Sequence, residues 1–103
     1  MMPAPVADAA VLLVRALRIS AREAGATITI VASDERSWAS VTFAGIRHRI
    51  DLDVEPDAAT AEWLASLAEA DLPIRGHLVA DLVVVRDADR IRLEVLTIEN
   101  DDM

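Results

Sequence analysis

Over residues 46–54, apolar side chains and one histidine alternate with charged side chains. One set comprises Ile46, His48, Ile50, Leu52 and Val54, and the set between them comprises Arg47, Arg49, Asp51 and Asp53. Successive side chains of a β-strand point to opposite faces of a sheet. The pattern therefore predicts a strand with one face against a core and one face in water.

Two runs that precede this segment predict two further strands. Residues 27–32 alternate with a period of two and end at the turn-forming residues 33–36, and a second run covers 38–44. A two-residue turn at Ala44-Gly45 then connects the second run to 46–54. Together the three runs predict an antiparallel meander.

Residues 6–24 have the spacing of an amphipathic helix. Apolar side chains recur at intervals of three and four, and Gly25 follows in a position suited to the left-handed conformation that ends a helix. The other side of this helix carries Arg15, Arg18 and Arg22.

A second helix is predicted at about 58–70. Its apolar stripe includes Trp63, which we expect in the core, and either Glu55 or Asp57 can cap its first turn. Pro73 and Gly76 then end the helical pattern.

The last segment predicts a β-hairpin with an acidic turn at 87–90. With Ala88 and Asp89 at its tip, Val84 lies opposite Leu93, and Ala80 lies opposite Thr97, on a face that joins the core. The opposite face then carries His77, Val79, Asp81, Val83, Val85, Arg92, Glu94, Leu96 and Ile98.

That second face of the hairpin is too apolar for a simple wetted surface. We expect another subunit, a peptide partner or a helix of the same chain to cover it. The candidate interface residues are Val79, Val83, Val85, Leu96 and Ile98, with Trp38. Trp38 falls on the polar face of its strand, where it either makes contacts or packs at an edge.

These elements predict one α+β domain over residues 1–103, with a frayed acidic tail at 100–103. The expected order is helix, three-stranded meander, helix and hairpin, and the favoured arrangement is one antiparallel sheet with both helices on one face. Two strand orders stay open, because the final hairpin can lie beside the first or the third strand of the meander.

The composition excludes several classes of function. The chain of 103 residues has 10 basic and 18 acidic side chains, a net charge of −8, which disfavours nucleic acid and anionic membranes as partners. It has no cysteine and only three scattered glycines, which excludes disulfides, iron–sulfur clusters and glycine-rich phosphate loops. There is no apolar run of transmembrane length and no signal peptide, so we expect a cytoplasmic protein. We also expect neither a metal nor a cofactor.

Three polar residues are candidates for chemistry. His48 and His77 are the only histidines, and the expected roles are a partly buried, hydrogen-bonded side chain for His48 and a surface position at a strand start for His77. Asp81 lies between valines and is expected to be ion-paired, hydrated or perturbed in its pKa, and the favoured partner is Arg92 or an arginine of another subunit. The alternative is a small enzyme or ligand-binding protein with a pocket between sheet and helices that uses these three residues.

Four acidic residues at the end of the meander raise the question of a calcium site. Their spacing lacks the central glycine and terminal glutamate of an EF-hand, so a solvated strand face and a helix cap are the favoured interpretation. They are Asp51, Asp53, Glu55 and Asp57. The same acids can neutralise Arg47 and Arg49, which otherwise resemble an anion-binding pair.

The order of elements over residues 6–99, together with small size and acidity, resembles the class I type III secretion chaperones. That family has a further C-terminal helix, which is absent here, and no sequence motif accompanies the resemblance. The resemblance implies a homodimer that holds an extended partner chain on apolar patches. We therefore expect a protein-interaction or chaperone-like module that acts as a homodimer and has no catalytic activity.

Overall fold

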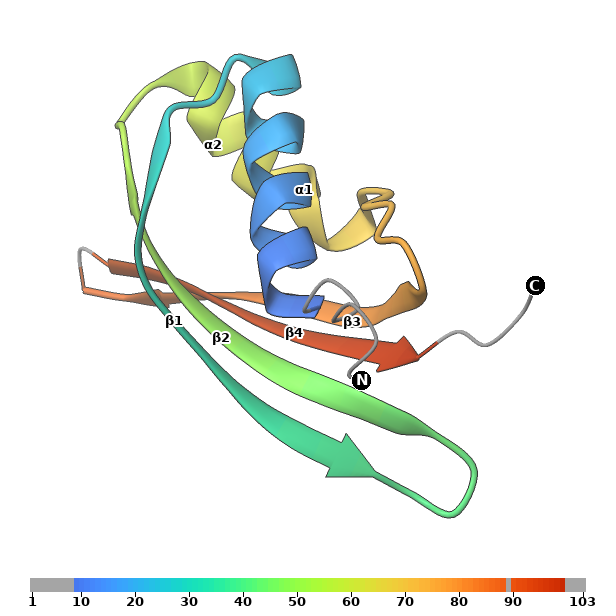
Figure 1. Ribbon diagram of the computed structural model, residues 1–103. Helices are drawn as coiled ribbons and strands as arrows, with labels where there is room; N and C mark the ends of the chain where they lie inside the picture. The colour runs from blue at the N-terminus through green and yellow to red at the C-terminus, as the bar shows by residue number, and fades with distance from the viewer. Residues whose placement is uncertain (1–8, 89, 100–103) are drawn as a thin grey trace, which may run out of the picture.

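The computed structural model describes residues 9–88 and 90–99 and shows an α+β fold (Figure 1). In chain order the elements are α1 (Ala9–Ala24), β1 (Ile28–Ala39), β2 (Ala44–Val54), α2 (Ala58–Ser66), the 3₁₀ turn η1 (Leu67–Glu69), β3 (His77–Asp87) and β4 (Arg90–Glu99). The four strands form one antiparallel sheet in the order β1-β2-β4-β3. Both helices lie on one face of the sheet, which we call the inner face, and the opposite face is the outer face.

The α+β class and the antiparallel pairing are confirmed, but the predicted meander has one strand too many. The first predicted strand continues through 33–36 to Ala39 as the long strand β1, and residues 40–43 of the second predicted strand form the turn into β2. Residues 33–36, which the composition predicts as a turn, continue the strand, since an exposed edge strand has room for polar side chains on both faces. The chain turns at Ser40 instead, whose hydroxyl accepts hydrogen bonds from the backbone N–H groups of Thr42 and Phe43. The turn expected at Ala44-Gly45 therefore lies inside the β1–β2 pairing.

The strand β2 has the two faces that its alternation predicts. Ile50 and Leu52 are buried on the inner face, whereas Arg47, Arg49 and Asp53 lie on the outer face. Of the two strand orders left open, the structure has the final hairpin beside 46–54, with β4 as the strand that pairs with β2. The two central strands, β2 and β4, supply most of the sheet's contribution to the core.

The register of the final hairpin agrees with the prediction over half of its length. Val84 pairs with Leu93 and Leu82 pairs with Val95, but a bulge at Ala80 shifts the rest, so that Val79 rather than Ala80 pairs with Thr97. A bulge adds one residue to one strand and reverses the faces beyond it. Val79 is therefore not part of an outer interface, because it packs against the core on the inner face.

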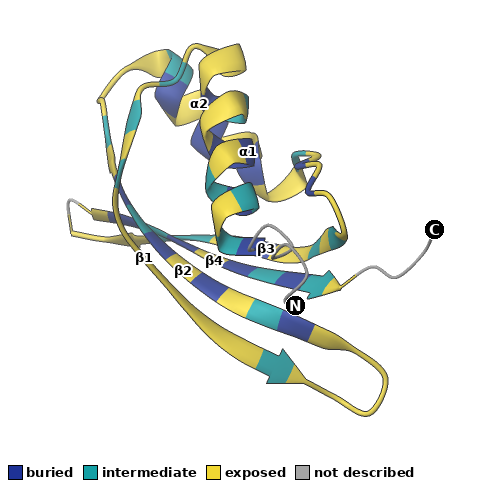
Figure 2. Cartoon of the chain, viewed as in Figure 1, coloured by how far each residue is buried: buried dark blue, intermediate teal, exposed yellow. Residues whose placement is uncertain are grey.

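The two helices cover the inner face and complete the core (Figure 2). Leu13 and Leu17 of α1 are fully buried, and Trp63 of α2 is 4% exposed with its indole Nε1 donating to Ser20 Oγ at 2.9 Å. Gly25 ends α1 in the left-handed conformation, with a φ of 75°. The predicted start of the first helix, before Ala9, lies outside the described residues, as does the acidic tail at 100–103.

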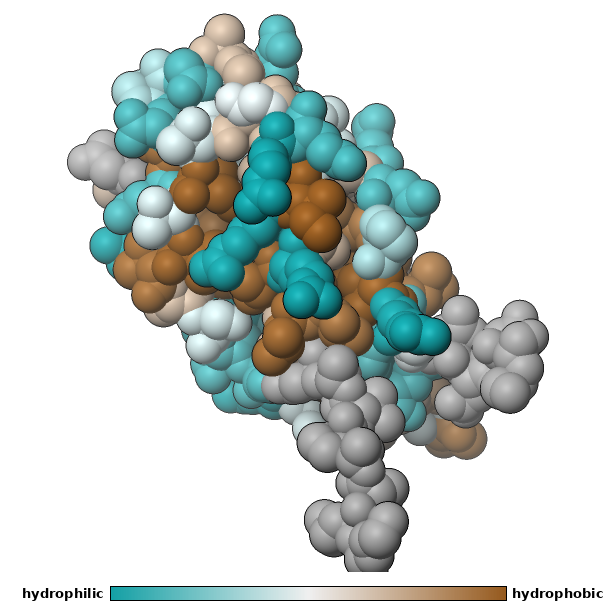
Figure 3. Space-filling model, turned by 45° about the horizontal axis from the view of Figure 1, so that its top comes forward, coloured by the Kyte–Doolittle hydropathy of each residue, from teal (hydrophilic) through white to brown (hydrophobic). Residues whose placement is uncertain are grey.

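Exposed arginines cross the side of the molecule on which α1 lies (Figure 3). They are Arg15, Arg18 and Arg22, as the helical spacing predicts. Figure 3 shows hydrophilic side chains between hydrophobic areas of this surface. Val11 and Ile19 of α1 are also exposed.

The β1–β2 hairpin extends beyond the helices and makes the molecule elongated (Figure 1). The principal extents are 47 × 24 × 24 Å, and the radius of gyration of 14.3 Å exceeds the value of about 13 Å that is typical of a compact domain of 100 residues. Val41 and Phe43 at the end of this hairpin are exposed. No helix in the described part of the chain is long and apolar enough to span a lipid bilayer.

Candidate functional site

The outer face of the sheet is the candidate functional site, because it has apolar side chains and neither helix packs on it (Figure 1). The pairing of the four strands arranges its side chains in rows across the sheet, each in the order β1, β2, β4, β3. The four rows are Trp38, Gly45, Ile98 and Leu78; Arg36, Arg47, Leu96 and Asp81; Asp34, Arg49, Glu94 and Val83; and Ala32, Asp51, Arg92 and Val85.

The apolar part of the outer face lies mainly on β3 and β4. Leu78 is 57% exposed and Val83 is 44% exposed, while Val85, Leu96 and Ile98 are half-buried. Each of these side chains stands on a strand that is paired at this position, so the backbone holds it in place. The candidate interface residues Val83, Val85, Leu96 and Ile98 are thus together on one surface, as their alternation predicts.

Trp38 extends this apolar surface onto β1 through Gly45. The two residues are paired across the strands, and a Cβ atom on Gly45 would lie 3.4 Å from the indole ring of Trp38 and collide with the carbonyl oxygen of Thr97. Trp38 therefore lies against a position without a side chain. The Arg47 guanidinium lies 6.0 Å from the centroid of the indole, at the outer limit of a cation–π contact.

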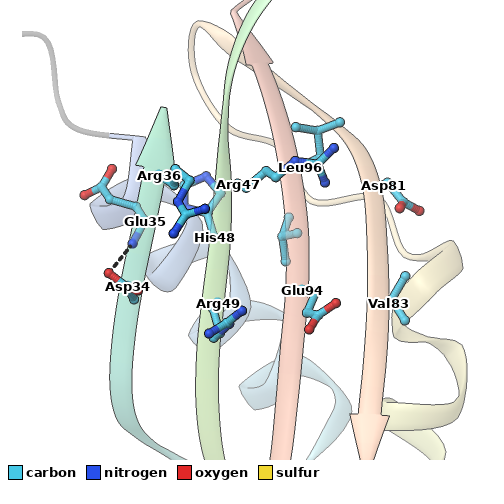
Figure 4. Close-up of a pocket in the computed structure, with 11 residues that line it drawn as sticks. Asp34, Glu35, Arg36, Arg47, His48, Arg49, Asp81, Val83, Glu94 and Leu96 are labelled. Carbon is cyan, nitrogen blue, oxygen red and sulfur yellow. Dashed lines mark hydrogen bonds between the residues drawn. The ribbon is translucent and has the colours of Figure 1, made fainter. Parts of the chain in front are cut away.

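Opposite charges line a hollow of about 230 Å³ in the middle of the outer face (Figure 4). Arg36, Arg47 and Arg49 come from β1 and β2, whereas Asp81 and Glu94 come from β3 and β4. Within the described chain, none of these five side chains has an ion pair within 4.0 Å. The strand β1 also contributes Asp34 and Glu35 to the lining, so the acids of the hollow are on both sides, whereas its arginines are all on the β1–β2 side.

The ion pair expected between Asp81 and Arg92 does not form. Arg92 Nε instead donates to Asp51 Oδ1 at 3.2 Å, across the β2–β4 pairing. Asp81 pairs in register with Leu96 and is exposed. Its carboxylate is therefore solvated on the outer face rather than held by an arginine of the neighbouring strand.

The three polar candidates Asp81, His48 and His77 do not converge on one site. His48 is 2% exposed on the inner face, where its Nε2 lies 2.9 Å from Thr97 Oγ1, as the interpretation of a buried, hydrogen-bonded histidine predicts. His77 pairs with Glu99 at the end of the sheet and lines a separate hollow of about 500 Å³ beside residues 70–75. The bulge at Ala80 places it on the inner side by alternation, not beside Asp81 as expected.

Two of the four clustered acids have structural partners. Asp51 is held by Arg92, and Asp57 caps α2 by accepting the Thr60 backbone N–H at 2.8 Å. This hydrogen bond, with a smaller contribution from the Thr60 side chain, lowers the pKa of the Asp57 carboxyl below its ordinary value of 3.8. Among the residues that the structure describes, no group of three or more acidic or histidine side chains could hold a metal ion.

Three outer-face residues are absent from the sequence-based interface. The sequence pattern assigns Asp34 and Arg36 to a turn, and it assigns Leu78 to the core side of the hairpin. The long strand β1 places the first two on the outer face, and the bulge at Ala80 places Leu78 there. Asp34 and Arg36 precede Trp38 at intervals of two residues, a spacing that places all three on one face of a strand. Nothing in the sequence marks the bulge.

The outer face combines fixed aliphatic side chains with arginines and carboxylates around a hollow of about 230 Å³. Comparison with protein-family models, with curated protein sequences and with solved structures finds no match to this chain.

Proposed function

We propose that this chain is a small protein-interaction module that acts as a homodimer through the outer face of its sheet. The observation that carries the proposal is the group of aliphatic side chains on β3 and β4 that neither helix covers. Among them Val83 is 44% exposed. Burial of apolar surface is the main driving force of protein association. A contiguous patch of this kind on a folded domain is typical of a contact site.

The arrangement of charges supports a specific contact rather than a site of aggregation. Arg36, Arg49, Asp81 and Glu94 surround the aliphatic side chains, and charged neighbours of this kind restrict which surface can dock. The net charge of −8 keeps separate molecules in solution, so association requires a complementary surface.

A chaperone-like role is part of this proposal. The class I type III secretion chaperones, which the order of elements resembles, hold extended partner chains as homodimers. The described part of the chain has one strand fewer before α2 than the order on which the resemblance was based. The uncovered outer face and the resemblance both imply a homodimer, so dimerisation is the property to test first.

The test is a comparison of Leu96→Arg with Val11→Arg by sedimentation velocity over a range of concentrations. Leu96 is at the centre of the outer face, whereas Val11 is an exposed apolar residue of α1 on the helical side of the molecule. Both variants introduce the same charge on the surface. We expect wild type and Val11→Arg to dimerise and Leu96→Arg to stay monomeric, because a charged group at the centre of an interface loses its hydration.

Circular dichroism establishes that both variants are folded before they are compared. A folded Leu96→Arg that dimerises as well as Val11→Arg would show that the outer face is not the contact surface. A wild-type chain that is monomeric at every concentration would overturn the homodimer itself.

A further inference from the structure

We infer that the outer face of a second copy docks on this outer face, about a two-fold axis that is parallel to the strands and passes between β2 and β4. The inference rests on the proposed function and specifies its geometry. It follows from how charge is distributed over the four rows of the outer face, which the strand register defines.

The charges on the outer face are unevenly distributed over the strands. All arginines of the hollow at its centre are on the β1–β2 side, beside Asp34 and Glu35, whereas the β3–β4 side contributes only the acids Asp81 and Glu94. Figure 4 shows Arg36, Arg49, Glu94 and Asp81 in strand order from β1 to β3. If a second copy docks with the two sides exchanged, its arginines lie over the side of the hollow whose charges are acidic.

Only one orientation of the symmetry axis exchanges the two sides. Two identical faces dock about a two-fold axis that lies in the plane of the interface. An axis parallel to the strands places β1 over β3 of the second copy and β2 over β4. An axis perpendicular to the strands would place each strand over its own counterpart with the order of the rows reversed, so that Arg47 would face Arg49 and the arginines would not meet Asp81 or Glu94.

The parallel axis brings three pairs of opposite charges together and no like charges, while Arg47 faces Leu96 and Asp34 faces Val83. Arg36 of one copy then lies over Asp81 of the other, and Arg49 lies over Glu94. Arg92, already bound to Asp51 at 3.2 Å in its own chain, meets Asp51 of the other copy, so four side chains can form one network. Such networks stabilise an interface more than isolated surface pairs do.

The same operation brings apolar residues together in the row at the end of the sheet. Trp38 lies over Leu78 of the second copy, and Gly45 lies over Ile98. The Trp38 indole and the Thr97 carbonyl oxygen occupy the space where a Gly45 side chain would lie, so Ile98 of the second copy meets the surface beside the indole. In the row at the other end, Ala32 faces Val85, again a small residue against a larger one.

The geometry also agrees with how sheets pack. Sheets that stack face to face in the aligned class keep their strands within about 30° of each other, which the parallel axis satisfies. At about 4.8 Å between strands and about 6.8 Å between rows, four rows of four strands cover roughly 500 Å² of each copy. This area is at the lower end for specific interfaces, so we expect a reversible dimer with a dissociation constant in the micromolar range or weaker.

The test uses two charge reversals at opposite edges of the sheet, Arg36→Asp and Asp81→Arg. Arg36 is on β1 and Asp81 is on β3, three strand spacings apart, or roughly 14 Å, so the two side chains cannot pair within one copy. In a dimer of either variant alone, both symmetry-related contacts between positions 36 and 81 bring like charges together. We expect each to dimerise at least about tenfold more weakly than wild type, because juxtaposed like charges oppose docking.

A mixture of the two variants has the opposite expectation. In a mixed dimer, the aspartate introduced at position 36 of one chain faces the arginine introduced at position 81 of the other. The unchanged Asp81 of the first chain faces the unchanged Arg36 of the second, so both contacts are attractive. We expect the equimolar mixture to regain dimers at the wild-type concentration, and native mass spectrometry identifies them as mixed by their mass.

The matched control mixes Asp81→Arg with Arg15→Asp. Arg15 lies on α1, so its reversal changes the net charge as Arg36→Asp does but is remote from the outer face. Arg15→Asp should dimerise with itself as wild type does. A mixed dimer with Asp81→Arg retains one contact between two arginines, so we expect few mixed dimers in this control.

The outcomes separate this inference from the proposed function. If Leu96→Arg abolishes dimers but the test mixture forms no more mixed dimers than the Arg15→Asp control, the outer face is the contact and the proposed axis is wrong. If Leu96→Arg, which would face Arg47 of the second copy, dimerises normally, the proposed function fails and the axis fails with it. Abundant mixed dimers in the test mixture alone support both.

Discussion

At the scale of single residues, the pair His48 and Thr97 is the clearest polar feature of the core. Both side chains are almost fully buried, at 2% and 0% exposure, and His48 Nε2 lies 2.9 Å from Thr97 Oγ1. Thr97 Oγ1 also lies 3.5 Å from the carbonyl oxygen of Ile46, to which it donates. A buried polar side chain without a partner is costly, so the threonine makes a histidine acceptable at a core position of β2.

Replacing Thr97 by valine tests this pair. Thr97→Val keeps the volume but removes the hydroxyl that meets His48 Nε2, and the loss of a buried hydrogen-bond partner lowers the free energy of unfolding by about 1–3 kcal/mol. Urea denaturation measures the change. Thr29→Val on the exposed part of β1 is the matched control and should change stability by less than about 0.5 kcal/mol. Equal effects of the two substitutions would show that the hydrogen bond does not contribute.

At the scale of elements, the start of α2 depends on contacts made by side chains. Asp57 accepts the backbone N–H of Thr60, and the hydroxyl of the buried Thr60 accepts the backbone N–H of Thr27 at 3.0 Å. The helix start is thereby connected to the residue that precedes β1. A short helix has little stability of its own, so such caps and contacts determine whether it forms.

The cap makes the stability of the protein depend on pH. Because the folded-state pKa of Asp57 is lowered, its stabilisation is complete above the ordinary value of 3.8 and is lost as the pH falls through the lowered pKa. Asp57→Ala should therefore reduce the melting temperature most at neutral pH, and its difference from wild type should shrink below pH 3.8. Thermal melts followed by circular dichroism measure this, with Asp57→Asn as a cap that does not titrate. A difference that is constant with pH would contradict the assignment.

At the scale of the whole molecule, the helices cover only part of the sheet. The core lies between α1, α2 and the central strands, while the β1–β2 hairpin extends past the helices and β1 is an edge strand of the sheet (Figure 1). Local opening costs least where few apolar groups are buried. The molecule therefore combines a stable central sheet with a less protected edge.

Amide hydrogen exchange should show this gradient. We expect the slowest exchange at Ile50, Leu52 and Leu93, which are buried in the two central strands, and faster exchange over residues 33–39 of β1. A face-to-face dimer adds no backbone partner to β1, so the fast exchange should persist at concentrations where dimers form. Protection of 33–39 equal to that of Ile50 would mean that another strand pairs with this edge.

The sequence by itself determined the positions of both helices and which face of each central strand meets the core. Apolar residues at helical spacing and the alternation over 46–54 reflect burial that the local chain already encodes. The same patterns predicted that His48 is a hydrogen-bonded residue of the core and that Trp63 is buried there, and the structure agrees. They also placed Val83 and Leu96 together on one uncovered face, where the structure has them.

Only the tertiary structure decided the length of β1, the bulge at Ala80 and the partner of Arg92. The residues 33–36 have turn composition, yet pairing with β2 keeps them extended, because backbone hydrogen bonds along a whole strand outweigh local preferences. The bulge exchanges Val79 for Leu78 on the outer face. Arg92 binds Asp51 rather than Asp81, because Asp51 is directly opposite it on β2, whereas Asp81 on β3 lies opposite Leu96. Such features depend on which strands are neighbours, and contacts between distant segments set that order, whereas periodicity within one segment carries no record of it.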